Sequence, residues 1–291
     1  MRELSFLKPV ALLEQATVLD PIIKRLKPAV IAIMKPRAVE DLLHGVPAGH
    51  PVHPVLVQIP IGTWSSAAVL DLVPGASRAS RLLVGVGVLS SASAIITGWA
   101  DWARSRPEQQ RVGLVHAAAN ELSTVLYALS WLDRRRGHEV RGRAISYAGF
   151  VTVTVGGYLG GHLAYRQGVG VSHAADVETR FPDGWQGLGP LDDLPEARPV
   201  RRDVDGEALL VLRRGGRVDA LSNVCTHLAA PLHEGTLSVE DGATCITCPL
   251  HDSVFDVETG EVVHGPATAP EPRFETRVVA GEVEVRLAPV G

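Results

Sequence analysis

Cys225-Thr-His227 and Cys248-Pro-Leu-His251 are the two fragments that decide the fold of the C-terminal part of this chain. Each fragment supplies one thiolate and one imidazole, and Cys248 follows His227 by 21 residues. Two such pairs provide the ligands of a [2Fe-2S] centre that has two cysteines on one iron and two histidines on the other. The same donors are compatible with zinc. Zinc fingers, however, usually carry both cysteines in one half and both histidines in the other, so the mixed halves favour iron and sulfur.

The residues that flank these fragments resemble the Rieske ferredoxin family. The matching segments are 221–225, 231–235, 252–256, 259–261 and 265–267. The resemblance covers about residues 188–288 and implies that Cys225, His227, Cys248 and His251 hold one cluster. Short runs of alternating apolar and polar residues, such as 208–213 and 282–287, predict the strands of a small antiparallel domain.

The resemblance also carries an expectation about the redox potential. Quinol-oxidising Rieske proteins add a disulfide whose cysteines would fall at Ala230 and Leu250, so that clamp is absent here. Ser253 stands where the family often has a hydroxyl donor to a cluster sulfide, and Phe255 stands where high-potential members use tyrosine. Because hydrogen bonds to sulfur tune such clusters, we expect a midpoint of roughly −150 to +50 mV. The third cysteine, Cys245, is expected to be a small buried hydrophobe.

Four apolar stretches predict a membrane domain that the overall composition conceals. With 46% hydrophobic residues and a net charge of −4, the chain could pass for a soluble protein. Stretches of about 20 apolar residues are nevertheless long enough to cross a bilayer. They lie at 53–73, 82–103, 112–132 and 144–165. The third is the least apolar, and a buried helix of a soluble domain is its alternative. The predicted fold is a four-helix transmembrane bundle followed by a small all-β Rieske domain.

The chain divides into four predicted segments. Residues 1–47 form an amphipathic arm without the features of a secretory signal peptide, and they could lie along a membrane surface. Residues 48–166 form the transmembrane domain. Residues 167–187 are rich in glycine and are expected to be a linker, and residues 188–291 form the Rieske domain.

A second resemblance concerns the apolar half. The segments 49–54, 60–62 and 98–101 are similar to a motif in a family of predicted four-helix membrane proteins of unknown function. The likeness spans about residues 42–170. It implies a fold but no established activity.

Four crossings would return the chain to its starting side, which places the N-terminus and the Rieske domain together. The histidines of the expected helices, with nearby carboxylate and amide groups, then map to that half of the bundle. These candidates are His50, His53, Asp101, His116, Asn120 and His162. One interpretation makes them ordinary polar residues of the headgroup region. The other makes some of them ligands of a b-type haem or another metal, and a quinone pocket is a further alternative.

The side on which the Rieske domain lies is weakly determined by charge. Near the helix ends, six basic residues on one side oppose seven on the other. The N-terminal arm adds five to the side of the Rieske domain, and the lack of a disulfide pair suits a reducing compartment. We expect a multi-pass protein of the cell membrane whose Rieske domain is cytoplasmic.

The leading functional hypothesis is a membrane-bound electron-transfer protein. It would exchange electrons with a reductase or oxygenase and with a haem or quinone in the bundle. Alternatives are a ferredoxin that uses the bundle only as an anchor and serves a separate oxygenase, and a redox sensor. A complete Rieske oxygenase is not expected, because its mononuclear iron needs two histidines and a carboxylate in a further domain, and about 40 residues follow His251. We find no dinucleotide fingerprint and no basic patch typical of nucleic-acid binding.

Overall fold

The computed structural model describes residues 8–289, which fall into two compact units. The first comprises Met1–Val39 and Pro51–Val169, and the second comprises Glu40–His50 and Gly170–Gly291. The segment 40–50, which we expected in the arm and at the start of the membrane domain, therefore groups with the C-terminal unit.

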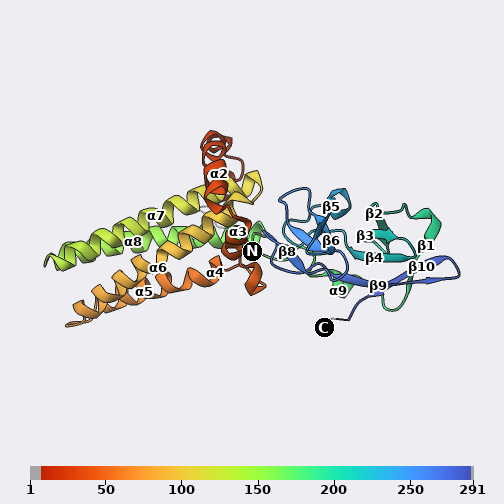
Figure 1. The fold of residues 1–291 in the computed structure, drawn as a ribbon. Helices are drawn as coiled ribbons and strands as arrows, with labels where there is room; N and C mark the ends of the chain where they lie inside the picture. Colours follow the sequence, from red (N-terminus) through yellow and green to blue (C-terminus); the bar gives the residue numbers. More distant parts are fainter. Residues whose placement is uncertain (1–7, 290–291) are drawn as a thin grey trace. The chain divides into compact units, whose positions relative to one another are not determined.

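The first unit is helical (Figure 1). Its N-terminal arm holds α1 (Lys8–Leu13), a short 3-10 turn (Thr17–Leu19), α2 (Asp20–Met34) and the start of α3 (Arg37–His44). The bundle holds α4 (His53–Leu56), α5 (Gln58–Leu70), α6 (Ser77–Ala103), α7 (Pro107–Arg135), α8 (Glu139–Gly161) and a π-helical turn (His162–Arg166).

The α4–α5 segment runs antiparallel to α6, and α7 runs antiparallel to α8, as contacts near both ends require. At the turn end, where residues 71–76 and 136–138 join the helices, the Ser80 hydroxyl donates to the Ala67 carbonyl and Ser130 donates to Gly142. At the opposite end, Nδ1 of His53 lies 2.9 Å from the carbonyl oxygen of Ala94. We call this opposite end the histidine end.

The bundle is apolar outside and partly polar inside. Large aliphatic side chains such as Val69, Leu89 and Val151 are more than 60% exposed. Buried serines and a threonine line the helix contacts: Ser80, Ser91, Thr97, Ser123, Ser130 and Ser146. The ring of Trp64 stacks on that of Tyr127, with centroids 4.2 Å apart. Small interior residues and an apolar exterior are typical of helices that pack in lipid.

The expectation of four transmembrane helices is confirmed only as a helical domain. Among the described residues, two helices are long and apolar enough to cross a membrane, α6 and α7. The stretch 53–73 is divided into α4 and α5, and α5 has 13 residues. Helix α8 has 23 residues but contains many glycines, which lower its apolar character.

The second unit contains the strands. They are β1 (Gln186–Pro190), β2 (Val200–Val204), β3 (Glu207–Arg214), β4 (Arg217–Ser222), β5 (Thr236–Glu240), β6 (Ala243–Thr247), β7 (Val254–Asp256), β8 (Val262–His264), β9 (Arg273–Val279) and β10 (Glu282–Leu287). Within the described residues they form a six-stranded sheet in the order β1-β10-β9-β4-β3-β2 and a four-stranded sheet in the order β5-β6-β7-β8. Every paired neighbour is antiparallel, which confirms the expected all-β domain.

The expected linker 167–187 is structured in its second half. It includes α9 (Val177–Arg180) and the first two residues of β1, Gln186 and Gly187. Ala174, Val177 and Phe181 are buried in the core of the large sheet, and the Phe181 ring lies 4.7 Å from that of Phe274. These apolar residues are interspersed with glycines. The glycine-rich composition that predicted a linker therefore conceals their contribution to the core.

The segment 40–50 packs on the turn that follows β8. One carboxylate oxygen of Asp41 accepts a hydrogen bond from the backbone N–H of Gly265 at 2.9 Å, and the other lies 2.8 Å from Nδ1 of His264. A Cβ atom added at Gly265 would lie 2.9 Å from the Val46 side chain, so the approach is close. Residues 40–50 are therefore an integral part of the second unit.

Candidate functional site

The first ligand loop follows β4 and carries Cys225 and His227. Its turn is closed by hydrogen bonds from the Cys225 N–H to the Ala230 carbonyl and from the Ala229 N–H to the Cys225 carbonyl. Ala229 has φ +57°, a left-handed conformation that the tight turn requires. The loop presents Cys225 inward, where it is fully buried, and leaves His227 half-buried.

The second ligand loop follows β6 and has the same design. The Cys248 N–H donates to the Ser253 carbonyl at 2.8 Å, and Asp252 adopts φ +63°. Cys248 is 2% exposed and His251 is 9% exposed. Because β6 pairs with β7 on the far side of this loop, Cys248 and His251 are held on a turn between two paired strands.

The structure brings the four predicted residues together. The imidazole rings of His227 and His251 have centroids 5.0 Å apart. The thiols of Cys225 and Cys248 are hydrogen-bonded to each other, which lowers the pKa of Cys248 to about 7 and raises that of Cys225. Burial adds to the rise at Cys225. Two sulfur and two nitrogen donors on two neighbouring loops fit the donor set of a Rieske cluster.

A third loop supports the second ligand loop through Ser253. The Ser253 side chain is fully buried, and its oxygen accepts a hydrogen bond from the Ala267 N–H at 3.0 Å. Since this bond occupies a lone pair, the hydroxyl proton remains available as a donor. The family resemblance assigns that proton to a cluster sulfide.

The remaining cysteine and the two positions of the family disulfide behave differently from the ligands. Cys245 is fully buried in β6, as expected for a small hydrophobe. Cys225, Cys245 and Cys248 are all free thiols. Ala230 is buried beside Cys225 in the same core, whereas Leu250 is 48% exposed.

Glu271 is a buried carboxyl group that the sequence analysis did not single out. Its Oε1 accepts a hydrogen bond from the backbone N–H of Thr226, between the two ligands of the first loop, at 2.7 Å. Its Oε2 is buried without a hydrogen-bond partner among the described residues. Burial raises the pKa of this carboxyl well above its usual range. No local motif marks Glu271, because its role depends on contact with a loop 45 residues away.

Two of the bundle histidines lie close together at the histidine end. The rings of His53 and His116 have centroids 6.4 Å apart. Nδ1 of His53 lies 2.9 Å from the Ala94 carbonyl oxygen, and Nδ1 of His116 lies 2.8 Å from that of Gly156. A carbonyl oxygen is an acceptor only, so both rings carry their proton on Nδ1 when neutral.

Asn120 joins this pair, whereas the other candidates have different surroundings. The Asn120 amide nitrogen lies within 3.4 Å of both ring nitrogens of His116. Nε2 of His162 lies 2.7 Å from a carboxylate oxygen of Glu14 in the N-terminal arm. Asp101 lies near the end of α6, and His50 belongs to the second unit. His53, His116 and Asn120 are therefore the predicted residues that the bundle brings into contact.

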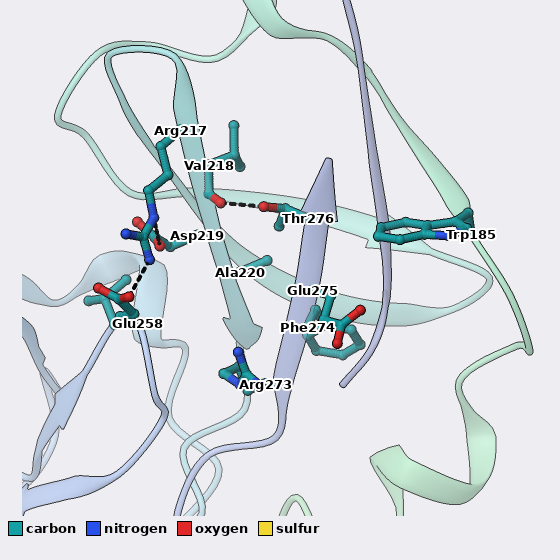
Figure 2. Close-up of a pocket in the computed structure, with 11 residues that line it drawn as sticks. Trp185, Arg217, Val218, Asp219, Ala220, Glu258, Arg273, Phe274, Glu275 and Thr276 are labelled. Atoms are coloured by element: carbon teal, nitrogen blue, oxygen red, sulfur yellow. Dashed lines mark hydrogen bonds and ion pairs between the residues drawn. The ribbon is translucent and has the colours of Figure 1, made fainter. Parts of the chain in front are cut away.

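A cavity of about 360 Å³ lies on the large sheet of the second unit (Figure 2). Arg217 pairs there with Asp219 and with Glu258, and the Thr276 hydroxyl donates to the Val218 carbonyl. None of the four cluster candidates lines this cavity. Because Arg217, Asp219 and Glu258 pair with one another there, we assign the cavity no ligand.

Comparisons with known proteins agree with this division. Residues 184–280 match the family model described as Rieske [2Fe-2S] domain, and residues 49–173 match that described as predicted membrane protein (DUF2231). The chain is 37% identical over 103 residues to the anthranilate 1,2-dioxygenase ferredoxin subunit of Burkholderia cepacia, covering 35% of this chain and 92% of that protein. It is 26% identical to the cytochrome b6-f complex iron-sulfur subunit of Chlorobaculum tepidum, of which it spans about half, 52%, and the match covers 35% of this chain.

Among solved structures, the ferredoxin of carbazole 1,9a-dioxygenase from Nocardioides aromaticivorans IC177 is 33% identical, with a TM-score of 0.34. The match covers 36% of this chain and all of that one. On the family model and the 37% identical ferredoxin subunit, the C-terminal unit is a Rieske-type ferredoxin domain, whose [2Fe-2S] cluster transfers electrons. The chain belongs to the Rieske [2Fe-2S] family through residues 184–280, and it joins that domain to an N-terminal domain of the predicted membrane protein family DUF2231.

Proposed function

We propose that this protein is a membrane-bound electron carrier whose Rieske cluster is held by Cys225, His227, Cys248 and His251. The convergence of two thiols and two imidazoles on two neighbouring loops carries the proposal. The cluster supplies a one-electron couple when bound. The chain's own residues bury the sulfur donors, leave His227 half-buried, and hold both loops through backbone hydrogen bonds.

Replacement of single cysteines tests this assignment. Cys225→Ser and Cys248→Ser should each abolish the EPR signal of the reduced cluster in the full-length protein. Cys245→Ser is the matched control, since Cys245 is equally buried but is not a proposed ligand, and it should keep the signal. One equivalent of zinc without iron in the wild-type protein, or loss of the signal only in Cys245→Ser, would overturn the assignment.

The bundle is proposed to cross the membrane four times. Beyond α6 and α7, the support is the exposed apolar surface of the remaining helices, which includes Ile59 and Val69 on α5 and Val151 and Val155 on α8. An even number of crossings returns the chain to its starting side. The N-terminus and the Rieske domain would then share one side, which we propose to be the cytoplasm. Reaction of introduced surface cysteines with an impermeant thiol reagent on intact cells tests this placement.

His53 and His116 are proposed to ligate a b-type haem or another metal ion within the bundle. The fit rests on their tautomer and spacing. Because each ring bonds a backbone carbonyl through Nδ1, Nε2 carries the lone pair that a metal binds. On His116 the Asn120 amide nitrogen lies 3.4 Å from Nε2 and would have to give way to the metal. Metal–nitrogen bonds of about 2.0–2.1 Å place the centroids of two imidazoles on one ion roughly 5–6.5 Å apart, depending on the angle at the ion. The observed separation is 6.4 Å. Such a centre would give the bundle a redox couple of its own.

Optical spectra of the full-length protein separate this role from simple anchoring. A haem would give a Soret band that His116→Ala removes while the Rieske EPR signal remains. His162→Ala is the control, because Glu14 engages that ring, and it should keep the band. Protein expressed with ample haem and iron that contains neither in the bundle would contradict the histidine site. The bundle would then be an anchor or a quinone site.

The similar dioxygenase ferredoxin subunit suggests the kind of partner. We propose that the cluster receives electrons from a reductase and passes them to an oxygenase, or to the centre in the bundle. A redox sensor is the alternative without electron transfer. Stopped-flow oxidation of the reduced cluster distinguishes the routes, since a centre in the bundle is reduced in the isolated protein whereas an external partner must be added.

A further inference from the structure

An arginine-lined cavity opens at the turn end of the bundle. It has a volume of about 770 Å³ and lies between the start of α6 and the last turns of α7. Its walls include Arg78, Arg81 and Arg135, together with the apolar side chains of Leu82 and Trp131. No acidic residue of the described chain lines it.

Two of the three acidic residues near this cavity, Asp71 and Asp133, are already paired with other arginines. Asp71 forms a two-point pair with Arg134, with nitrogen–oxygen distances of 2.7 and 2.5 Å, and both side chains are completely buried. Asp133 pairs in the same way with Arg141. Within 71–81 and 130–143 there are seven arginines and three acidic residues. The arginines that line the cavity therefore form a local excess of positive charge.

Two of these arginines are held in place before any ligand binds. The Arg135 guanidinium lies 4.7 Å from the centroid of the Trp131 ring, a cation–π contact. Arg81 donates to the Arg134 carbonyl at 3.4 Å. Gly85 lets Trp131 approach α6, since a Cβ atom there would lie 2.7 Å from the indole nitrogen. Arg78 is exposed at the rim.

The chemistry of this cavity fits a phosphate group. Guanidinium groups bind phosphate oxygens through two parallel hydrogen bonds, and several of them around one cavity favour a doubly or singly charged phosphate over a neutral ligand. Leu82, which lines the cavity, is 66% exposed, and Leu72 (76%) and Val73 (45%) lie in the loop that contributes Gly75 to it. These would meet acyl chains.

We propose that the arginine cavity binds the phosphate of an anionic phospholipid. Arg78 and Arg135 contact the phosphate from opposite walls, and Leu82 and Trp131 contact the glycerol and the first part of the acyl chains. Arginine guanidinium groups at helix ends suit anionic headgroups. With the four crossings proposed above, this cavity faces the leaflet opposite the Rieske domain. This site is separate from the Rieske centre. It rests on the membrane placement of the bundle proposed above, but not on the redox role.

Native mass spectrometry of the full-length, cluster-loaded protein tests the proposal. The detergent-solubilised protein is titrated with phosphatidylglycerol, with phosphatidylcholine and, separately, with inorganic phosphate. Phosphatidylglycerol should bind with a preference over phosphatidylcholine. Arg78→Gln and Arg135→Gln should each weaken its binding about tenfold, which corresponds to about 1.4 kcal/mol.

Arg136→Gln is the matched control, since it removes the same charge from the adjacent exposed position but does not line the cavity. The affinity of this variant for phosphatidylglycerol should stay within about twofold of that of the wild type, as expected for an exposed charge outside the site. Binding of inorganic phosphate with the same dependence on Arg78 and Arg135 would support a phosphate site whose ligand is free phosphate. An equal loss of phosphatidylglycerol binding in Arg136→Gln would overturn the proposal. So would a wild-type protein that shows no preference for the anionic headgroup and does not bind inorganic phosphate. Arg78 is exposed, so its variant keeps the test valid if Arg135→Gln fails to fold.

Discussion

At the scale of single residues, Ser253 shows how a buried hydroxyl can serve two neighbours. Its oxygen accepts from the Ala267 N–H, so the geometry of the third loop determines where the proton can point. Sequence resemblance alone suggested the donor role. The structure adds the reason why the side chain has one orientation, which is that the amide of another loop holds its oxygen.

Replacing Ser253 by alanine should lower the cluster potential, because a hydrogen bond to sulfide favours the more negative reduced state. A bond of about 1 kcal/mol corresponds to roughly 40 mV for a one-electron couple. A redox titration followed by EPR measures the shift. Ser238→Ala, which changes a hydroxyl in β5 outside the ligand loops, is the control and should leave the potential unchanged. An unchanged midpoint in Ser253→Ala would show that its hydroxyl does not reach the sulfide.

Glu271 should make the stability of the Rieske domain depend on pH. Burial raises its pKa in the folded protein above 4.5, the ordinary value. Its contribution to stability is therefore fully present below that value and is lost as the pH rises through the raised pKa. Glu271→Gln keeps an acceptor for the Thr226 N–H and removes this loss.

The variant should consequently gain thermal stability relative to the wild type as the pH increases from about 5 to about 9, the range above the ordinary pKa of a glutamate. Melting temperatures of the full-length protein at both values test this. Glu258→Gln, an exposed site on the same unit, should show no such trend. A wild-type curve parallel to that of Glu271→Gln would mean that Glu271 does not titrate in this range.

At the scale of helices, the contact between α5 and α6 depends on a glycine. A Cβ atom at Gly87 would overlap the indole nitrogen of Trp64, and Trp64 is fixed by its stacking on Tyr127. The indole cannot move aside without disturbing that stack. Small residues that allow close approach are the usual means of packing helices in lipid.

Gly87→Ala should therefore destabilise the bundle by about 1–3 kcal/mol, the cost of overpacking a core. Gly62→Ala is the control, since nothing lies within 4 Å of its added methyl group. That change should be neutral or slightly stabilising, because alanine favours helix more than glycine does. Thermal unfolding in detergent compares the two variants, and equal effects would contradict a steric clash with Trp64 as the cause at Gly87.

At the scale of the whole molecule, the chain enters the C-terminal unit twice. Residues 40–50 belong to that unit although they precede the bundle in sequence. Asp41 is a polar anchor of this segment, through Gly265 and His264. The Rieske domain is thus built from two separated parts of the chain.

Asp41→Ala should release the segment from its domain and increase hydrogen exchange at residues 40–50 and 262–267. Losing two charge-assisted hydrogen bonds costs about 1.5–3 kcal/mol each, so exchange should rise at least about tenfold. Asp192→Ala is the control, because that carboxylate is 96% exposed. Unchanged exchange in Asp41→Ala would show that contacts other than those of Asp41 hold the segment.

The sequence by itself determined the local chemistry of the Rieske domain. Cys225, His227, Cys248 and His251 lie in two short motifs, so their neighbours along the chain were enough to predict their pairing in space. The helical character of the N-terminal half was also predictable, because a long apolar stretch is a pattern of neighbours along the chain. Four membrane crossings did not follow with equal strength, because the first stretch is divided between α4 and α5 and α8 is rich in glycine.

Contacts between distant segments were decided only by the tertiary structure. Glu271 reaches Thr226 across 45 residues, Asp41 reaches His264 across 223, and the hydrogen bonds that set the tautomers of His53 and His116 come from neighbouring helices. No sequence periodicity or local motif marks the residues that make these contacts. A buried carboxyl group, a docking aspartate and a ring tautomer depend on which backbone amides and carbonyls packing brings within about 3 Å. That distance is a property of the folded chain.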